Sequence, residues 1–95
     1  MIDEKNARHI FREQPGHLAD TPTNRQLLEE TASNPTYFLG TDKYGNDWYA
    51  KTLSNGTQVW TQVRKGQIRN CGLNNSPRQF HPQTGFSSPT KPGQS

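Results

Sequence analysis

The fold of this chain is decided by the stretch WYAKTLSNGTQVWTQVR, which runs from Trp48 to Arg64. Two segments rich in aromatic and β-branched residues, 48–53 and 57–64, flank the pair Asn55-Gly56. Asparagine and glycine both tolerate positive φ, so this pair favours a two-residue turn between antiparallel strands. The stretch therefore predicts a β-hairpin.

Further strands are expected on both sides of the hairpin. Residues 37–40 form a short apolar run before it, and Lys65-Gly66 is a weaker turn candidate that returns the chain through residues 68–71. The sequence therefore predicts an antiparallel meander of about three to five strands.

A first helix is predicted over residues 3–13. Ala7, Ile10 and Phe11 fall on one face at helical spacing, and Pro15-Gly16 ends the pattern. His9 lies at the edge of this apolar face. It is either a partly buried histidine or a functional one.

A second helix is predicted over residues 22–32, before Asn34-Pro35. Asp20 or Thr21 can cap it, and a proline is tolerated at its first position. Its buried face is expected to contain Leu27, Leu28, Thr31 and Ala32. Arg25 either binds a phosphate at the helix N-terminus or pairs with Glu29 one turn later.

These elements predict one α+β domain over residues 1–88, with two N-terminal helices packed on one face of the sheet and a flexible, disordered tail over 89–95. Only 27% of the 95 residues are hydrophobic, so the core is expected to be thin. The net charge of +3 suits an anionic partner, but it is also common in proteins that bind nothing charged.

Several classes of site and segment are not expected. The single cysteine, Cys71, excludes an internal disulfide and a thiolate metal cluster. The three histidines lack a metal-binding spacing, so no metal or other cofactor is predicted. No run is apolar enough to span a membrane, and the N-terminus has no signal-peptide pattern, so export is expected to depend on a larger parent protein.

The pairing of the strands sorts side chains between the two faces of the sheet. If both turns have two residues, Thr52 pairs with Val59, and Val63 pairs with Trp48 and Ile68. The face toward the helices is then expected to hold Trp48, Ala50, Thr52, Val59, Thr61, Val63 and Ile68. The opposite face is expected to hold Tyr49, Lys51, Trp60, Gln62, Arg64, Arg69 and Cys71.

The second face mixes aromatic rings with cations and amides. Rings stack on bases and cations hold phosphates, so such a face fits RNA. Alternatively, the C-terminal segment, with Phe80 and Phe86, folds over this face and buries Trp60. The two interpretations are compatible. If the C-terminal segment folds over the sheet, Arg78 and Thr84 are expected to lie at the edge of the sheet.

Cleavage of RNA without a metal needs a group that exchanges protons and groups that hold the charged phosphate. His17 can exchange protons, Arg25 can hold phosphate, and the hydroxyl of Thr84 can donate to a phosphate oxygen. Cys71 has no histidine beside it in the sequence and is interpreted as a small apolar filler.

A linked set of short motifs resembles the C-terminal RNase toxin domains of bacterial contact-dependent inhibition and polymorphic toxin systems. The motifs are Arg8-His9-Ile10-Phe11, Gly16-His17, Asp20-Thr21-Pro22, Asn24-Arg25 with Leu27-Leu28, Trp48-Tyr49-Ala50, Gly56-Thr57-Gln58-Val59-Trp60, Val63-Arg64 with Gly66 and Ile68, Asn74 with Pro77-Arg78, and Pro82 with Thr84-Gly85. That group is similar to the superfamily that joins barnase, EndoU, the RNase colicins and RelE.

The resemblance implies a fold with helices on one face of the sheet and RNA cut on the other. It implies a metal-independent endoribonuclease, with tRNA as the expected substrate and 2′,3′-cyclic phosphate ends as products. It also implies a cognate immunity protein. The chain would be the C-terminal part of a larger secreted or cell-surface protein and would act in the cytoplasm of the target cell.

The resemblance also implies roles for individual residues. His17 would be the general acid or base, Arg25 would clamp the scissile phosphate, and Thr84 would hydrogen-bond it. His9 and His17 together resemble the histidine pair of EndoU. The residues expected to bind RNA are Tyr49, Lys51, Trp60, Arg64, Arg69 and Arg78.

Two other functions fit the same residues. A non-catalytic module could bind RNA or protein through the basic aromatic face. An enzyme could instead act on another phosphodiester such as DNA, although attack by a neighbouring 2′-hydroxyl favours RNA.

Overall fold

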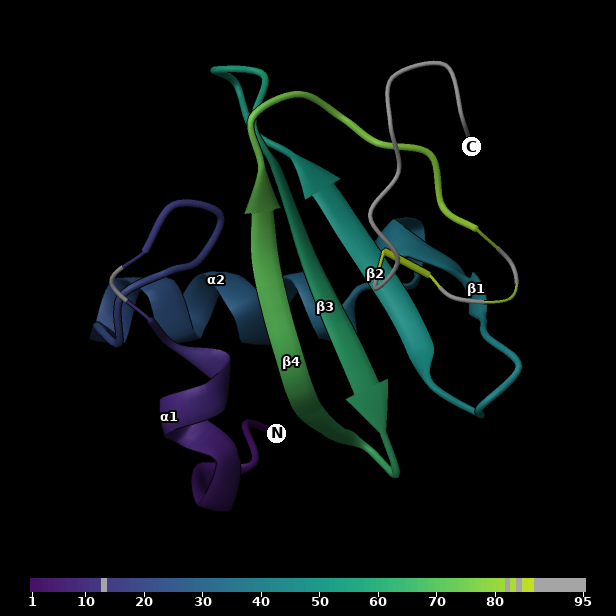
Figure 1. Cartoon of the computed structure of the whole chain (residues 1–95), viewed down its shortest axis with the longest axis horizontal. Helices are drawn as coiled ribbons and strands as arrows, with labels where there is room; N and C mark the ends of the chain where they lie inside the picture. The colour runs from purple at the N-terminus through teal and green to yellow at the C-terminus, as the bar shows by residue number, and fades with distance from the viewer. Residues whose placement is uncertain (13, 82, 84, 87–95) are drawn as a thin grey trace.

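A computed structural model describes residues 1–12, 14–81, 83, 85 and 86. It confirms the α+β class, with two short helices and a four-stranded antiparallel sheet in the order β1-β2-β3-β4. The predicted tail, residues 89–95, lies outside the described residues. The strands are β1 (Phe38–Thr41), β2 (Asp47–Thr52), β3 (Gln58–Arg64) and β4 (Gln67–Asn74) (Figure 1).

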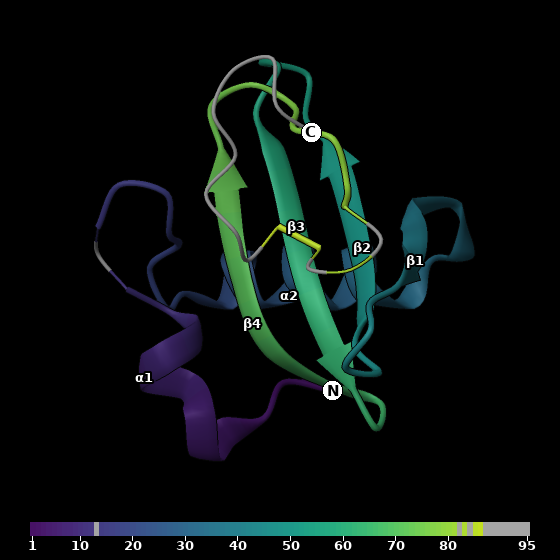
Figure 2. The same cartoon turned by 45° about the vertical axis from the view of Figure 1, so that its right-hand side comes forward.

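The second helix, α2 (Pro22–Ser33), begins at the predicted residue and ends one residue later than predicted. Thr21 is the cap, because its side chain accepts a hydrogen bond from the backbone N–H of Asn24. The helix runs across one face of the sheet, against β2 and β3 (Figures 1 and 2). The predicted buried face is confirmed, with Leu28, Thr31 and Ala32 buried and Leu27 partly buried.

The first helix is shorter than predicted. A 3-10 turn, η1 (Glu4–Asn6), leads into α1 (Ala7–Ile10), and the backbone is extended at Phe11. The helix stops there because Phe11 pairs with Leu18 and both side chains enter the core. The chain therefore turns back as a loop over residues 14–20, and α1 lies beside the outer edge of β4 (Figure 1).

The β2–β3 hairpin forms as predicted, but its register differs by one residue. Thr52 pairs with Gln58 rather than Val59, and Trp48 with Gln62 rather than Val63. The loop has three residues, 54–56, because Leu53 N donates to Thr57 O at 2.8 Å and Gly56 N donates to Leu53 O at 2.9 Å. Gly56 takes a φ of 88°, which glycine adopts without strain.

This shift exchanges the faces of the β2 side chains. Tyr49 and Lys51 lie on the face toward the helices, and Trp48 lies on the opposite face, so both predictions were wrong. The predicted Val63–Ile68 pair is confirmed. A bulge after this pair turns Cys71 toward the helices rather than away from them.

The sheet has apolar side chains on both faces. The core on the helix face contains Ile10, Phe11, Leu28, Val59 and Ile68. On the other face, the rings of the fully buried Trp48, the half-buried Trp60, Phe80 and Phe86 form an aromatic cluster.

Chain segments after β4 therefore cover the sheet face that was predicted to bind RNA. The ring centroids of Trp60 and Phe86 are 6.0 Å apart, and those of Trp48 and Phe86 are 5.7 Å apart. A Cβ added at Gly85 would overlap the indole of Trp48, so the backbone at Gly85 lies directly against that ring. The described residues after β4 therefore contact this face as the second interpretation expected, and they leave Trp60 half-buried rather than buried.

Asp42 holds the turn between β1 and β2 against the aromatic cluster. Its carboxylate accepts hydrogen bonds from Trp48 Nε1 at 2.8 Å, Tyr44 N at 2.8 Å and Asn46 N at 3.0 Å. Burial raises the pKa of Asp42, but these hydrogen bonds outweigh it and leave the pKa below its usual value.

Replacing Asp42 by asparagine is expected to lower the free energy of unfolding by about 2–3 kcal/mol, because an amide NH₂ would face donor groups. Urea unfolding at pH 7 measures the loss. Because the folded-state pKa is lowered, the wild-type contribution is present above about pH 4 and is lost as the pH falls through the folded value.

The matched control is Asp47→Asn, since Asp47 is half-buried and accepts from Thr41 Oγ1. It is expected to cost less than about 1 kcal/mol. Equal losses in the two variants would contradict the role of Asp42.

Candidate functional site

An open pocket of about 520 Å³ lies between the N-terminal helical turns and one end of the sheet. The residues that line this imidazole pocket are Asn6, His9, Asn46, Gln62, Arg64 and Arg69. Two guanidinium groups, one imidazole and three amides face it, and no carboxylate is among the described residues of the lining. Such a lining favours an anionic ligand.

Each of the two arginines of the imidazole pocket has one polar contact within the part of the chain that the structure describes. Arg69 Nε lies 3.3 Å from Asp3 Oδ2, outside hydrogen-bond geometry, and the Arg69 side chain is 39% exposed. Arg64 Nη2 donates to the carbonyl of Tyr44 at 3.1 Å. A guanidinium carries five N–H donors, so each arginine keeps donors for a ligand.

His9 is fixed in one tautomer by Arg12. Arg12 Nη2 lies 2.6 Å from His9 Nδ1, and Arg12 Nε donates to the backbone carbonyl of His9 at 3.1 Å. Because a guanidinium only donates, Nδ1 of His9 is the acceptor, and Nε2 carries the proton of the neutral ring.

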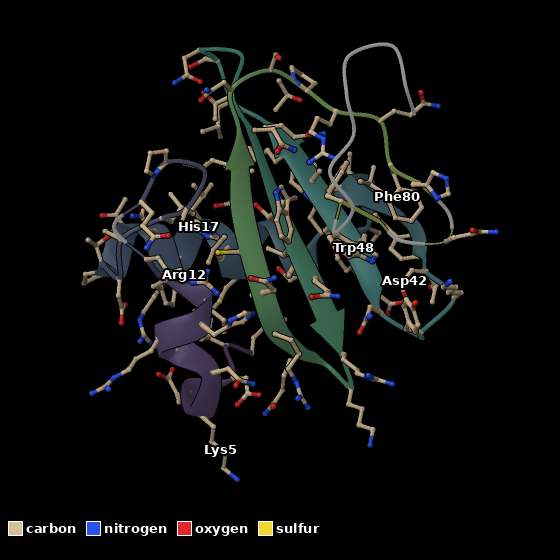
Figure 3. The ribbon with its side chains drawn as sticks, in the orientation of Figure 1. Lys5, Arg12, His17, Asp42, Trp48 and Phe80 are labelled. Carbon is tan, nitrogen blue, oxygen red and sulfur yellow. The ribbon has the colours of Figure 1, made fainter. Side chains whose placement is uncertain are left out.

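His17 lies next to this pair but outside the lining of the imidazole pocket. Its loop is held by Leu73 N, which donates to Gly16 O at 2.9 Å, and by Arg12 N, which donates to Leu18 O at 2.9 Å. Figure 3 shows Arg12 and His17 beside β4, whereas Trp48, Phe80 and Asp42 lie toward β2. Burial, then the charges of Arg12 and His9, lower the pKa of His17.

His17 is expected to titrate below pH 6.5 in an NMR pH titration of the folded chain, and Arg12→Ala is expected to raise that pKa. Removal of the Arg12 charge stabilises the imidazolium, while the burial that contributes most remains. The exposed Arg8 is the control, and Arg8→Ala is expected to leave the titration of His17 in place. An equal shift in both variants would contradict a specific effect of Arg12.

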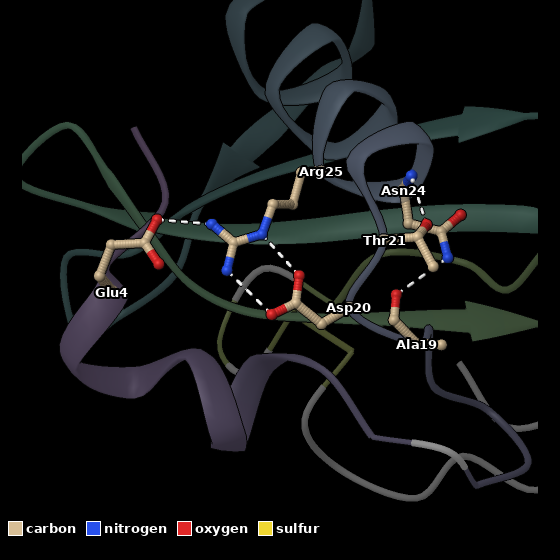
Figure 4. Close-up of polar contacts among 6 residues, drawn as sticks. All are labelled: Glu4, Ala19, Asp20, Thr21, Asn24 and Arg25. Carbon is tan, nitrogen blue, oxygen red and sulfur yellow. Dashed lines mark hydrogen bonds and ion pairs between the residues drawn. The ribbon is translucent and has the colours of Figure 1, made fainter.

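Arg25 forms a network of ion pairs that differs from the predicted pair with Glu29. Its guanidinium binds both carboxylate oxygens of Asp20, and Nη1 donates to Glu4 Oε2 at 2.6 Å (Figure 4). The hydrogen bond to Asp20, followed by the one to Glu4, raises the pKa of Arg25. The Arg25 guanidinium also lies over the ring of Phe11, 5.2 Å from its centroid.

These contacts compete with the predicted binding of a phosphate to Arg25. A phosphate at Arg25 would have to displace two carboxylates, and among the described residues no hydrogen bond or ion pair joins Arg25 to His17. The network instead ties the N-terminal turn η1 to the start of α2 (Figure 4).

The other residues predicted to bind RNA lie in two different parts of the fold. Lys51 forms an ion pair with Glu30 at 3.6 Å, on the face toward the helices, and Tyr49 packs on Phe38 with ring centroids 5.3 Å apart. Arg78 lies 5.9 Å from the ring centroid of Phe86, in the aromatic cluster with Trp60.

Thr84 lies outside the described residues, so its predicted hydrogen bond to phosphate stays a prediction. Among the predicted residues, the imidazole pocket brings together His9, Arg64 and Arg69.

Sequence reasoning missed Asn6, Asn46 and Arg12 as parts of the site. Arg12 follows His9 by three residues, but α1 ends at Ile10, so the contact forms beyond the helix and no helical spacing predicts it. Asn6 and Asn46 come from a 3-10 turn and from a strand connection, for which no sequence signal predicts a shared pocket.

Cys71 has the predicted structural role. The thiol is buried, Sγ donates to the carbonyl of Ile10 at 3.2 Å, and burial raises the pKa of Cys71 to about 12. The protonated thiol is a poor nucleophile at neutral pH.

Comparison with known proteins finds no matching family model, no matching curated protein and no matching solved structure. Within the part of the chain that the structure describes, no helix is long and apolar enough to cross a membrane.

Proposed function

We propose that this chain is a metal-independent endoribonuclease that cuts RNA at the imidazole pocket and leaves 2′,3′-cyclic phosphate ends. One observation carries the proposal: His9 shares a concave site with Arg64 and Arg69, in a lining without a described carboxylate. An exposed pocket of this kind suits the charged backbone of a nucleic acid.

The reaction needs one proton to leave the 2′-hydroxyl and one to reach the departing 5′-oxygen. The 2′-oxygen bonds to phosphorus, the bond from phosphorus to O5′ breaks, and negative charge grows on the non-bridging oxygens. Arg64 and Arg69 can stabilise that charge by hydrogen bonds from their guanidinium groups. The imidazole of His9 is the group in the lining suited to exchange the protons.

Arg12 controls when His9 can accept a proton. With Arg12 bound to Nδ1, the neutral ring only donates, through Nε2–H. When the Arg12 guanidinium moves away from Nδ1, that nitrogen can take up the proton of the 2′-hydroxyl while Nε2–H donates to the departing oxygen. His17 lies outside the lining, so its predicted role as general acid or base is not part of this mechanism.

The wider proposal is an RNase toxin module of the barnase, EndoU, RNase colicin and RelE type, with tRNA as the substrate. The order of two helices followed by an antiparallel meander supports this assignment, together with the motifs quoted above. A cognate immunity protein would neutralise the module, and an acidic surface on that partner would complement the basic pocket. Delivery would place the module at the C-terminus of a larger secreted protein.

The direct experiment incubates the purified chain with total RNA and with tRNA in excess chelator. We expect discrete cleavage products with chelator present, and growth arrest when the chain is expressed alone in bacteria. Intact RNA bound by the protein would favour the non-catalytic binding module, and cleavage of DNA of the same sequence would favour another phosphodiester as the substrate. Either outcome would overturn the proposal.

A further inference from the structure

A second open pocket, of about 620 Å³, adjoins the imidazole pocket and shares Asn6 and Arg69 with it. We call it the N-terminal pocket. Its other described lining residues are Ile2, Asp3, Glu4, Lys5 and Gln67. The Arg69 side chain therefore stands at the boundary between two concave sites, each with room for a nucleoside.

The two pockets differ in charge. The imidazole pocket has two guanidinium groups and an imidazole. The N-terminal pocket shares the guanidinium of Arg69 but balances it and the ammonium of Lys5 with the carboxylates of Asp3 and Glu4. Carboxylates repel a phosphate but accept hydrogen bonds from hydroxyl and N–H groups. The N-terminal pocket thus suits a neutral sugar and base, and the imidazole pocket suits the phosphate.

The contacts of the shared residues keep this boundary in place. Asn6 Nδ2 donates to Asp3 Oδ2 at 2.9 Å, and the same oxygen lies 3.3 Å from Arg69 Nε. The Asp3 side chain is 10% exposed, so this carboxylate mainly orients Asn6 and Arg69. Gln67 is exposed and faces a ligand more openly. The Glu4 side chain is also 66% exposed, although its Oε2 accepts from Arg25.

We infer that the N-terminal pocket is a nucleoside subsite, which binds the sugar and base of a nucleotide whose phosphate lies at Arg69. This inference rests on the proposed function for the choice of RNA as the ligand. It adds a specificity-determining role for Gln67 and Lys5, neither of which belongs to the residues proposed to act on phosphate.

The test measures binding to the whole chain by calorimetry or NMR titration, with inorganic phosphate and with the four ribonucleoside 3′-monophosphates. We expect at least one nucleotide to bind about tenfold more tightly than phosphate, as one or two added hydrogen bonds would provide. Gln67→Ala is expected to remove most of that advantage and to leave phosphate binding as it is. Gln26→Ala, at an exposed position of α2, is the matched control.

Two outcomes would overturn the inference: nucleotides that bind no more tightly than phosphate, or a nucleotide advantage that survives Gln67→Ala and Lys5→Ala. The result is separate from the proposed catalysis. Tight nucleotide binding through Gln67 without RNA cleavage would refute the endoribonuclease and leave the subsite standing. RNA cleavage without a nucleotide advantage would refute the nucleoside subsite and leave the endoribonuclease standing.

Discussion

Replacing His9 by alanine is expected to slow RNA cleavage by about 10²–10⁴-fold, the usual contribution of a group that exchanges protons in the transition state. His9 is the imidazole in the described lining of the imidazole pocket, so no second ring there replaces it. Single-turnover cleavage of a defined tRNA by the purified variant measures the loss. Binding of the uncleaved RNA should change far less, because Arg64 and Arg69 remain.

The matched control is His81→Ala. His81 is also exposed, but its Nδ1 accepts from Gln83 N at 3.2 Å, in the chain that follows β4. This variant is expected to cleave RNA at the wild-type rate. Equal rates for the His9 and His81 variants, with both folded by circular dichroism, would remove His9 from the mechanism.

Replacing Gly85 by alanine is expected to lower the free energy of unfolding by about 3 kcal/mol. The added methyl group would overlap the fully buried indole of Trp48, and overpacking of this kind costs about 1–3 kcal/mol. The φ of +64° at Gly85 adds about 1 kcal/mol for a residue with a Cβ. Urea unfolding followed by tryptophan fluorescence reports the loss, together with the exposure of Trp48 and Trp60.

Gly45→Ala separates the two causes. Gly45 has a φ of +85°, but nothing lies within 4 Å of a Cβ added there. The variant is therefore expected to lose about 1 kcal/mol, the backbone cost alone. If Gly85→Ala lost no more than Gly45→Ala, the chain around Gly85 would not be packed on the sheet.

Local signals predicted the second helix well. Thr21 and Pro22 mark its start, and Asn34 precedes the proline at which it cannot continue. These residues act through their own backbone geometry and nearest hydrogen bonds, so no knowledge of the rest of the fold was needed.

The register of the β2–β3 hairpin was predicted one residue out. Asn55-Gly56 fits a two-residue turn, but a glycine in the left-handed region also ends a three-residue loop, and this chain uses the longer loop. A shift of one residue moves Trp48 across the sheet. The aromatic cluster that results depends on Phe80 and Phe86, which follow β4 and lie far from Trp48 in sequence.

The candidate site was predicted as separate parts rather than as one pocket. His9, Arg64 and Arg69 were each singled out, but their meeting depends on how α1 packs beside β4. For Arg25, the sequence left a phosphate and Glu29 as alternative partners, and the structure supplies neither. Asp20 is five residues away but was considered only as a helix cap, and Glu4 is 21 residues away and is brought close only by the fold.

The most direct test of the proposed function is the chemistry of the RNA ends left by the purified chain in the presence of chelator. Attack by the 2′-hydroxyl predicts 2′,3′-cyclic phosphate and 5′-hydroxyl ends, and no cleavage of an RNA that carries a single 2′-deoxy substitution at the mapped cut site. Cleavage of that deoxy-substituted RNA, or products with 5′-phosphate ends, would contradict attack by the 2′-hydroxyl and with it the proposed function.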